Sequence, residues 1–126
     1  MNDQAFSPTI YLKDKCPFCM KIRIFLLESG LRDQVVVKDF TPGTDAEQEI
    51  RSEVSPHLEK VSFPAAQVAP GEFIADSDGI ISRLAQGAGV DPGQMPVLKA
   101  YLEGPFQQIM TLFRENMELK KQQTPA

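Results

Sequence analysis

Apolar and polar positions divide the first part of the chain into a strand, a helix and a second strand. An apolar run at 8–12 is strand-like, and a helical pattern follows at 17–29, with Gly30 as its expected C-cap. Three consecutive valines predict a buried strand at 34–40. A strand–helix–strand unit of this length implies a parallel pair with a right-handed crossover. The expected apolar stripe of the helix consists of Met20, Ile24 and Leu27, widened by Ile22, Phe25 and Leu26.

Two Pro-Gly pairs organise the middle of the chain. The first, at 42–43, breaks the chain, and a short helix capped by Thr44 or Asp45 is expected to run through 53. The second pair supplies a tight turn between strands expected at 65–69 and 72–74. These two strands therefore form an antiparallel hairpin.

The last third of the chain is helical in pattern. Asp76 or Ser77 is expected to cap a helix that runs to about residue 86. Residues 95–121 follow as two helices, or as one helix kinked at Pro105. An apolar stripe in this tail consists of Phe106, Ile109, Met110, Phe113 and Met117. We expect the stripe to pack on its own domain; the alternative is a subunit interface, which would give a homodimer through the C-terminal helices.

Composition narrows the class of protein. The chain has 126 residues, which suits one domain with a core that needs no disulfide bonds, and its formal net charge is −4. Its basic residues are scattered, which argues against a nucleic-acid partner. No apolar run approaches the ~20 residues of a membrane span, and the N-terminus does not resemble a signal peptide. We therefore expect a cytoplasmic protein.

The sequence Cys-Pro-Phe-Cys at 16–19 marks the expected start of the first helix. Pro17 suits the first helical position, which leaves Cys16 as the N-cap with free backbone N–H groups facing its sulfur. Those donors and the helix dipole favour a thiolate, and Lys13 and Lys15 add positive charge just upstream. Cys16 is thus the expected nucleophile. Cys19 lies one turn later on the same face, where its sulfur can resolve a mixed disulfide.

The non-catalytic alternatives for the two cysteines are half of a zinc site or a pair of buried thiols. Zinc needs about four ligands, and besides carboxylates the chain offers only Cys16, Cys19 and a single His57. No metal is therefore expected. No carboxylate or cysteine lies at a spacing from His57 that indicates a shared site, so we assign His57 to a solvated loop.

The order of elements, with the two cysteines opening the first helix, resembles the thioredoxin superfamily over about residues 8–88. The likeness is closest to glutaredoxins and to the N-terminal domain of glutathione transferases. Three matches carry it: the segment 13–19, Phe63-Pro64 before the third strand, and Asp-Ser-Asp at 76–78. The resemblance implies an α/β, thioredoxin-like fold, which is a mixed four-stranded sheet flanked by helices, with a helical C-terminal extension. We expect a domain at 1–88 and the extension at 89–126.

The resemblance also implies a glutathione site. Pro64 corresponds to the family's cis-proline, which exposes the backbone of Phe63 to pair with the cysteinyl residue of glutathione. The alternative is an ordinary trans-proline at a strand edge. Asp76 and Ser77 correspond to the acidic-serine pair that holds the γ-glutamyl end, although helix capping alone would also explain them.

Two more residues are candidates for the same site. Lys13 corresponds to the lysine that precedes many glutaredoxin motifs, where it lowers the thiol pKa and attracts the glycyl carboxylate; as a surface lysine it would do neither. Phe18 would offer an apolar platform beside the thiol, or only wedge the loop. One departure is visible: Ile74-Ala75 stands where glutaredoxins usually carry Gly-Gly, which favours the transferase-like branch.

Together these features predict an enzyme, a glutathione-dependent thiol–disulfide oxidoreductase that acts through Cys16 on glutathionylated or disulfide-containing substrates. A full helical second domain of the transferase type does not fit in the residues after Val90. The alternatives are a transferase or isomerase that uses bound glutathione, a non-catalytic glutathione-binding module, and a carrier of an iron–sulfur cluster.

Overall fold

A four-stranded mixed sheet forms the centre of the molecule. The computed structural model describes residues 6–123, and its strands are β1 (Thr9–Lys13), β2 (Val36–Phe40), β3 (Ala65–Ala69) and β4 (Glu72–Ile74). The strand order is β2-β1-β3-β4; β1 and β2 are parallel, and the other two pairs are antiparallel. The helices are α1 (Pro17–Ser29), α2 (Asp45–Val54), α3 (Ser77–Ala88), α4 (Pro96–Glu103) and α5 (Pro105–Gln123), with short 3₁₀ turns η1 (Arg32–Gln34), η2 (Ser55–His57) and η3 (Pro92–Gln94).

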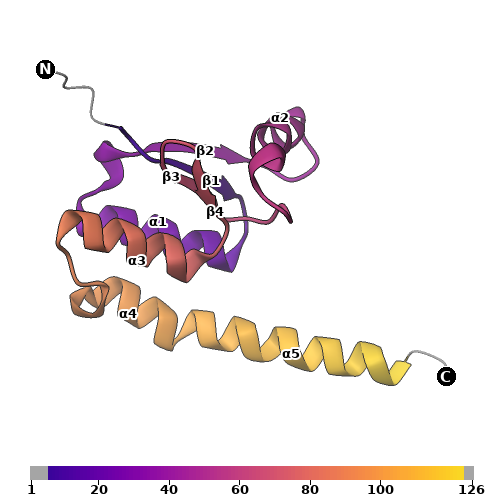
Figure 1. Cartoon of the computed structure of the whole chain (residues 1–126). Coiled ribbons are helices and arrows are strands. Elements are labelled where there is room, and N and C mark those ends of the chain that lie inside the picture. Colours follow the sequence, from indigo (N-terminus) through magenta and orange to yellow (C-terminus); the bar gives the residue numbers. More distant parts are fainter. Residues whose placement is uncertain (1–5, 124–126) are drawn as a thin grey trace, which may run out of the picture.

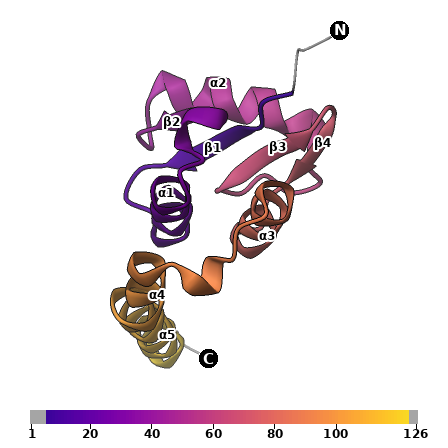
Figure 2. The ribbon, with the colours of Figure 1, turned by 90° about the vertical axis from the view of Figure 1, so that its left-hand side faces the viewer.

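Helices cover both faces of this sheet (Figures 1 and 2). Helices α1 and α3 lie on one face, α2 lies on the other, and α4 and α5 form a further layer beyond α1 and α3. The parallel β1–α1–β2 unit and the β3–β4 hairpin are both present, as expected. The mixed sheet with flanking helices and a helical extension is confirmed.

Strand β1 is central, so both of its faces are buried. Ile10 and Leu12 face the larger core, together with Ile22 and Phe25 of α1. The side chain of Tyr11 points to the smaller core under α2. Because β1 is fixed on both faces, the loop that follows it enters α1 at a defined position.

Two expectations about burial are wrong. Strand β2 is an edge strand, and only Phe40 of its five residues is buried, so the valine run does not make a buried strand. In α1 the buried face consists of Cys19, Lys21, Ile22, Phe25 and Leu26. Met20 and Leu27, expected at the centre of the stripe, are exposed.

The C-terminal tail forms two helices, broken at Gly104 and Pro105. Of its expected apolar stripe only Phe106 is buried, whereas Ile109, Phe113 and Met117 are exposed. The expectation that this stripe packs on its own domain is therefore wrong. Met95 and Leu98, in contrast, join the larger core, so the helical layer begins as part of the α/β body. The division after residue 88 stays a prediction.

Candidate active site

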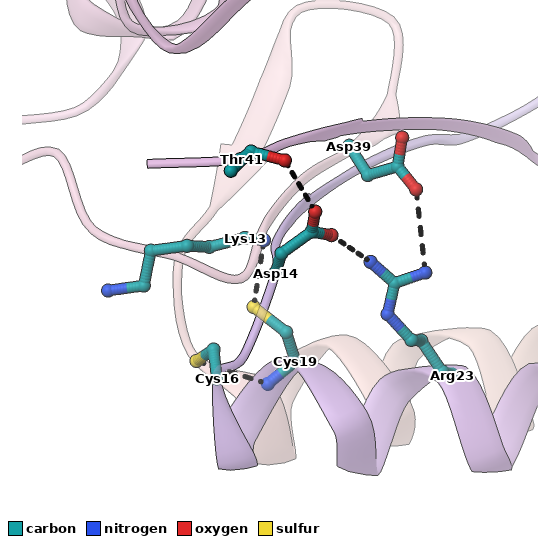
Figure 3. A network of polar contacts seen from close by, with 7 residues as sticks. All are labelled: Lys13, Asp14, Cys16, Cys19, Arg23, Asp39 and Thr41. Atoms are coloured by element: carbon teal, nitrogen blue, oxygen red, sulfur yellow. Dashed lines mark hydrogen bonds and ion pairs between the residues drawn. The ribbon is translucent and has the colours of Figure 1, made fainter. Parts of the chain in front are cut away.

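Cys16 is the N-cap of α1, as the sequence predicts. Its backbone is extended (φ −116°, ψ 123°), and Pro17 follows at the start of the helix. The backbone N–H of Cys19 donates to Cys16 Sγ across 3.4 Å (Figure 3). The Cys16 thiol is half-buried and free, so it meets both the helix N-terminus and solvent.

Cys19, unlike Cys16, has no contact with solvent. Its side chain is fully buried, and the backbone N–H of Lys13 donates to its sulfur across 3.2 Å. Figure 3 shows the Cys19 sulfur pointing toward the end of β1, whereas Cys16 lies at the tip of the helix. The two thiols are thus placed as an outer and an inner sulfur.

This asymmetry separates the two pKa values. The pKa of Cys16 falls from 9.0 to about 6, chiefly because the Cys19 thiol donates a hydrogen bond to its sulfur. The backbone N–H groups of Cys19 and Phe18 and the charge of Lys13 lower it further, while burial opposes them. The pKa of Cys19 is raised by the same hydrogen bond and by burial. At neutral pH the outer sulfur is the thiolate and the inner one the thiol.

A polar network holds the loop between β1 and α1. Arg23 of α1 contacts Asp14 (3.4 Å) and Asp39 (3.5 Å), and the hydroxyl of Thr41 donates to Asp14 across 2.8 Å (Figure 3). The backbone N–H of Asp14 also donates to Phe40 O. The network ties the loop before Cys16 to the end of β2. The sequence alone does not indicate this network, because its residues come from three separate segments that only the fold brings together.

The sheet register brings Phe63 and Pro64 to this end of the molecule. Ala65 pairs with Tyr11, so the two residues before β3 lie beside the end of β1 and the start of the cysteine loop. The Phe63-Pro64 peptide bond is cis, the isomer expected from the resemblance. Pro64 is buried, and Phe63 is half-buried with its ring edge against Phe40. Phe63 lies outside the paired register of β3.

The start of α3 lies near the start of α1. Asp76 is its N-cap and accepts the backbone N–H of Gly79 across 3.0 Å, which confirms the capping expectation. The Asp76 side chain is exposed, whereas Ser77 is buried. Lys21 of α1 forms an ion pair with Asp78 across 2.9 Å, which connects the second turn of α1 to the first turn of α3. The predicted residues of 13–19, 63–64 and 76–77 therefore gather at one end of the sheet.

Three aromatic residues border the cysteine loop on the side of the helical extension. The Tyr101 hydroxyl donates to Pro17 O across 2.7 Å, and its pKa is raised by burial and by the charge of Cys16. Phe18 lies with its edge against Phe106 of α5, with ring centroids 5.4 Å apart. The apolar platform expected of Phe18 thus continues into the extension. Sequence reasoning missed Tyr101, which is separated from Pro17 by 84 positions.

Within residues 6–123, no group of three or more His, Cys, Asp or Glu side chains is placed to hold a metal ion. His57 is exposed and stacks on Phe73, with ring centroids 4.1 Å apart. In the same part of the chain, no helix combines the length and apolarity that crossing a bilayer requires.

Comparisons with known proteins agree with this geometry. A family model described as glutathione S-transferase, N-terminal domain, matches residues 11–100. The match begins in β1 and ends within α4, so α5 lies outside it. A search of curated proteins finds no match. The family match covers well over half of the chain and includes both cysteines, Pro64 and the start of α3. The chain therefore belongs to the glutathione S-transferase N-terminal domain family, whose fold is thioredoxin-like.

Proposed function

We propose that this protein is a glutathione-dependent thiol–disulfide oxidoreductase with Cys16 as its nucleophile. The observation that carries the proposal is the accessible Cys16 sulfur at the N-terminus of α1, with a pKa of about 6 and a protonated thiol beneath it. Such a sulfur is a thiolate at neutral pH, which is the form that attacks disulfides. Both cysteines are free, which suits a reducing compartment such as the cytoplasm.

The proposed catalytic cycle consists of two thiol–disulfide exchanges. Cys16 thiolate attacks the glutathione sulfur of a mixed disulfide, that S–S bond breaks, and the partner leaves as a thiolate that takes a proton from solvent. A second glutathione thiolate then attacks the Cys16–glutathione disulfide, which releases glutathione disulfide and restores the Cys16 thiolate. In a side branch, Cys19 loses its proton and attacks the Cys16 sulfur of the Cys16–glutathione disulfide, which breaks that bond, releases glutathione as a thiolate and forms the internal Cys16–Cys19 disulfide. A glutathione thiolate then attacks Cys16, which restores the Cys16–glutathione disulfide and releases Cys19 as a thiolate that takes up a proton.

The residues around Cys16 suit the parts of glutathione. The unpaired backbone of Phe63 would bond the cysteinyl residue as an added strand does. Asp76 uses one carboxylate oxygen for capping and is exposed, so its other oxygen is available to the γ-glutamyl ammonium. The α3 N–H groups and the hydroxyl of Ser77 would take the α-carboxylate, and Lys13 would attract the glycyl carboxylate. Ser77 is the least accessible of these groups.

Two matched variants test the proposal. Cys16→Ser abolishes reduction of a glutathionylated peptide, because no other described thiol is accessible. Cys19→Ser retains part of the activity, because the two-step exchange on Cys16 does not need a resolving sulfur. Equal loss in both variants would refute the route through Cys16 alone. Normal glutathione binding without turnover on any disulfide would instead indicate a binding module.

A second candidate, a transferase or isomerase that uses bound glutathione, is favoured by one observation. The exposed ring of Phe18, backed by Phe106 and Tyr101, places an aromatic group next to the cysteine loop, where an apolar co-substrate could contact it. The family match points in the same direction. Consumption of glutathione with an apolar electrophile, in an assay without disulfides, would support this candidate.

A further inference from the structure

Arg23 lies one helical turn after Cys19 and on the same side of α1. Figure 3 shows both side chains extending from the helix toward Asp14, in the loop that follows β1. The Arg23 guanidinium is fixed there by ion pairs to Asp14 (3.4 Å) and to Asp39 of β2 (3.5 Å). A positive charge is therefore held on the side of α1 to which the inner sulfur points.

Chemistry at Cys19 requires a group that stabilises negative charge. When a thiolate attacks Cys16 in the internal disulfide, the electron pair of the S–S bond leaves on Cys19 Sγ. That sulfur is buried, so water cannot solvate the charge that forms on it. The backbone N–H of Lys13 donates to this sulfur across 3.2 Å, and the charge of Arg23 lowers the pKa of the Cys19 thiol. Both groups favour the thiolate of Cys19 over its neutral form.

We propose that Arg23 is a positioning residue for exchange at Cys19, where its charge stabilises the Cys19 thiolate while the internal disulfide opens and closes. The proposal rests on the proposed function, since it concerns the side branch of that cycle. In opening, the attacking thiolate bonds to Cys16 Sγ, the S–S bond breaks, and Cys19 leaves as a thiolate that takes up a proton. Closing is the reverse: Cys19 loses its proton, attacks Cys16, and glutathione leaves as a thiolate.

The other charges around the inner sulfur make this role of Arg23 necessary. Cys16 is a thiolate at neutral pH in the reduced protein, and its charge raises the pKa of Cys19. Asp14 and Asp39, which hold Arg23, are negative as well. A variant without the guanidinium therefore leaves Cys19 in a more negative surrounding, in which its thiolate is harder to form.

General thiol chemistry sets the size of the effect. A nearby opposite charge shifts a pKa by about 1–3 units, and the partial exposure of Arg23 favours the lower part of that range. With a Brønsted coefficient of about 0.4–0.5, loss of the charge should slow exchange at Cys19 about three- to tenfold. The equilibrium between disulfide and dithiol should change little, because Cys19 is protonated in the reduced protein and the charge of Lys13 acts on Cys16.

Reduction of the internal disulfide by dithiothreitol tests this role without a glutathionylated substrate. The full chain is oxidised with glutathione disulfide, and its reduction at pH 7 is followed by an alkylating quench and mass spectrometry. Arg23→Gln should lower the rate about three- to tenfold, whereas Arg23→Lys keeps the charge and should stay within about 1.5-fold of the unmodified chain. In glutathione buffers, the equilibrium constant of Arg23→Gln should change by less than about twofold.

Thr41→Val is the matched structural control, because it removes a hydrogen bond to Asp14 without changing a charge. It should leave the reduction rate unchanged. An unchanged rate in Arg23→Gln overturns the proposal, as does a chain in which glutathione disulfide never closes the bond between the two cysteines. If Arg23→Lys or Thr41→Val is as slow as Arg23→Gln, the network acts by holding the loop and not through charge, which also overturns it. The proposed function fails separately, if Cys16→Ser keeps its activity on a glutathionylated peptide.

Discussion

At the scale of single residues, the decisive feature is that two cysteines one turn apart have opposite environments. Cys16 gains a thiol donor, two backbone N–H groups and a nearby lysine charge, whereas Cys19 is buried. Alkylation of Cys16 by iodoacetamide should therefore have a pH midpoint near 6 instead of 9.0. At pH 7 about 90 % of Cys16 would be thiolate. Rates measured from pH 4 to about 10 give the midpoint directly.

A matched variant identifies the cause of that acidity. Because the Cys19 thiol is the largest contribution to the low pKa of Cys16, Cys19→Ala should move the alkylation midpoint upward. Cys16→Ser should leave no rapidly labelled site, since Cys19 is buried and its pKa is raised. An unchanged midpoint in Cys19→Ala would show that the backbone N–H groups and the charge of Lys13 set the acidity without the Cys19 thiol.

Tyr101 is a positioning residue for the same loop. Its hydroxyl donates to Pro17 O, one residue after Cys16, and its ring lies 5.7 Å from that of Phe106. Tyr101→Phe keeps the ring and removes the donor, so it should lower the free energy of unfolding by about 1 kcal/mol. Tyr101→Ala also removes the ring and should cost clearly more. Urea denaturation measures both, and equal losses would mean that the hydrogen bond is the whole contribution of Tyr101.

At the scale of elements, the first turn of α4 is capped by another helix. Met95 is its N-cap and provides no side-chain hydrogen bond, but the Glu28 carboxylate of α1 accepts the backbone N–H groups of Val97 and Leu98, each across 2.8 Å. Glu28→Ala should therefore lower the free energy of unfolding by about 1–2 kcal/mol. Glu49→Ala, at an exposed glutamate of α2, is the control and should change it by less than about 0.5 kcal/mol. Equal effects would show that the hydrogen bonds from the first turn of α4 to Glu28 contribute nothing to stability.

The elements also show how far the sequence predicts the fold. Gly30 ends α1, Asp76 begins α3 and the Pro-Gly turn joins β3 to β4, each through local backbone conformation. The end of α1, the start of α3 and the hairpin were therefore predictable. Helix α1 is apolar around much of its circumference, so spacing alone did not identify the face that packs on the sheet. The valines of β2 indicated a strand correctly, but only the strand order shows that it is an edge.

The candidate site likewise has residues that the sequence predicts and residues that it does not. Cys16 as the N-cap of α1 and the cis bond before Pro64 agree with expectation because each depends on a short local motif. Tyr101 and Glu28 were not predicted because each acts across about seventy or more positions in the chain. Ordinary tyrosines and glutamates carry no local signal, so such contacts appear only when α4 is seen packed against α1.

At the scale of the whole molecule, one buried lysine connects three helices. The Lys21 side chain of α1 is 6 % exposed and pairs with Asp78 of α3, whose side chain is 83 % exposed. The Lys21 ammonium also lies 4.8 Å from the ring centre of Phe106 in α5 and 5.7 Å from that of Phe18. The charge thus lies where the helical extension meets the active-site helix and α3.

Because Lys21 is buried and Asp78 is exposed, we expect the two single substitutions to change the free energy of unfolding by different amounts. Asp78→Asn leaves the Lys21 charge buried without its counter-ion, so it should lower the free energy of unfolding by about 1–2 kcal/mol. Lys21→Met removes the charge and fills its space with an apolar chain of similar length, while Asp78 stays in water. That variant should cost less than about 1 kcal/mol.

A double-mutant cycle isolates the buried charge from other roles of Asp78. In the Lys21→Met background, Asp78→Asn should cost only its helix-dipole contribution, about 0.5 kcal/mol. Glu72→Gln breaks the pair with Arg83, in which both side chains are exposed, and should cost no more than about 1 kcal/mol. If Asp78→Asn costs the same with and without Lys21, the lysine does not hold the three helices together through its charge. Their cohesion would then come from other contacts, such as the core that α1 shares with α3 and the packing of Phe18 on Phe106.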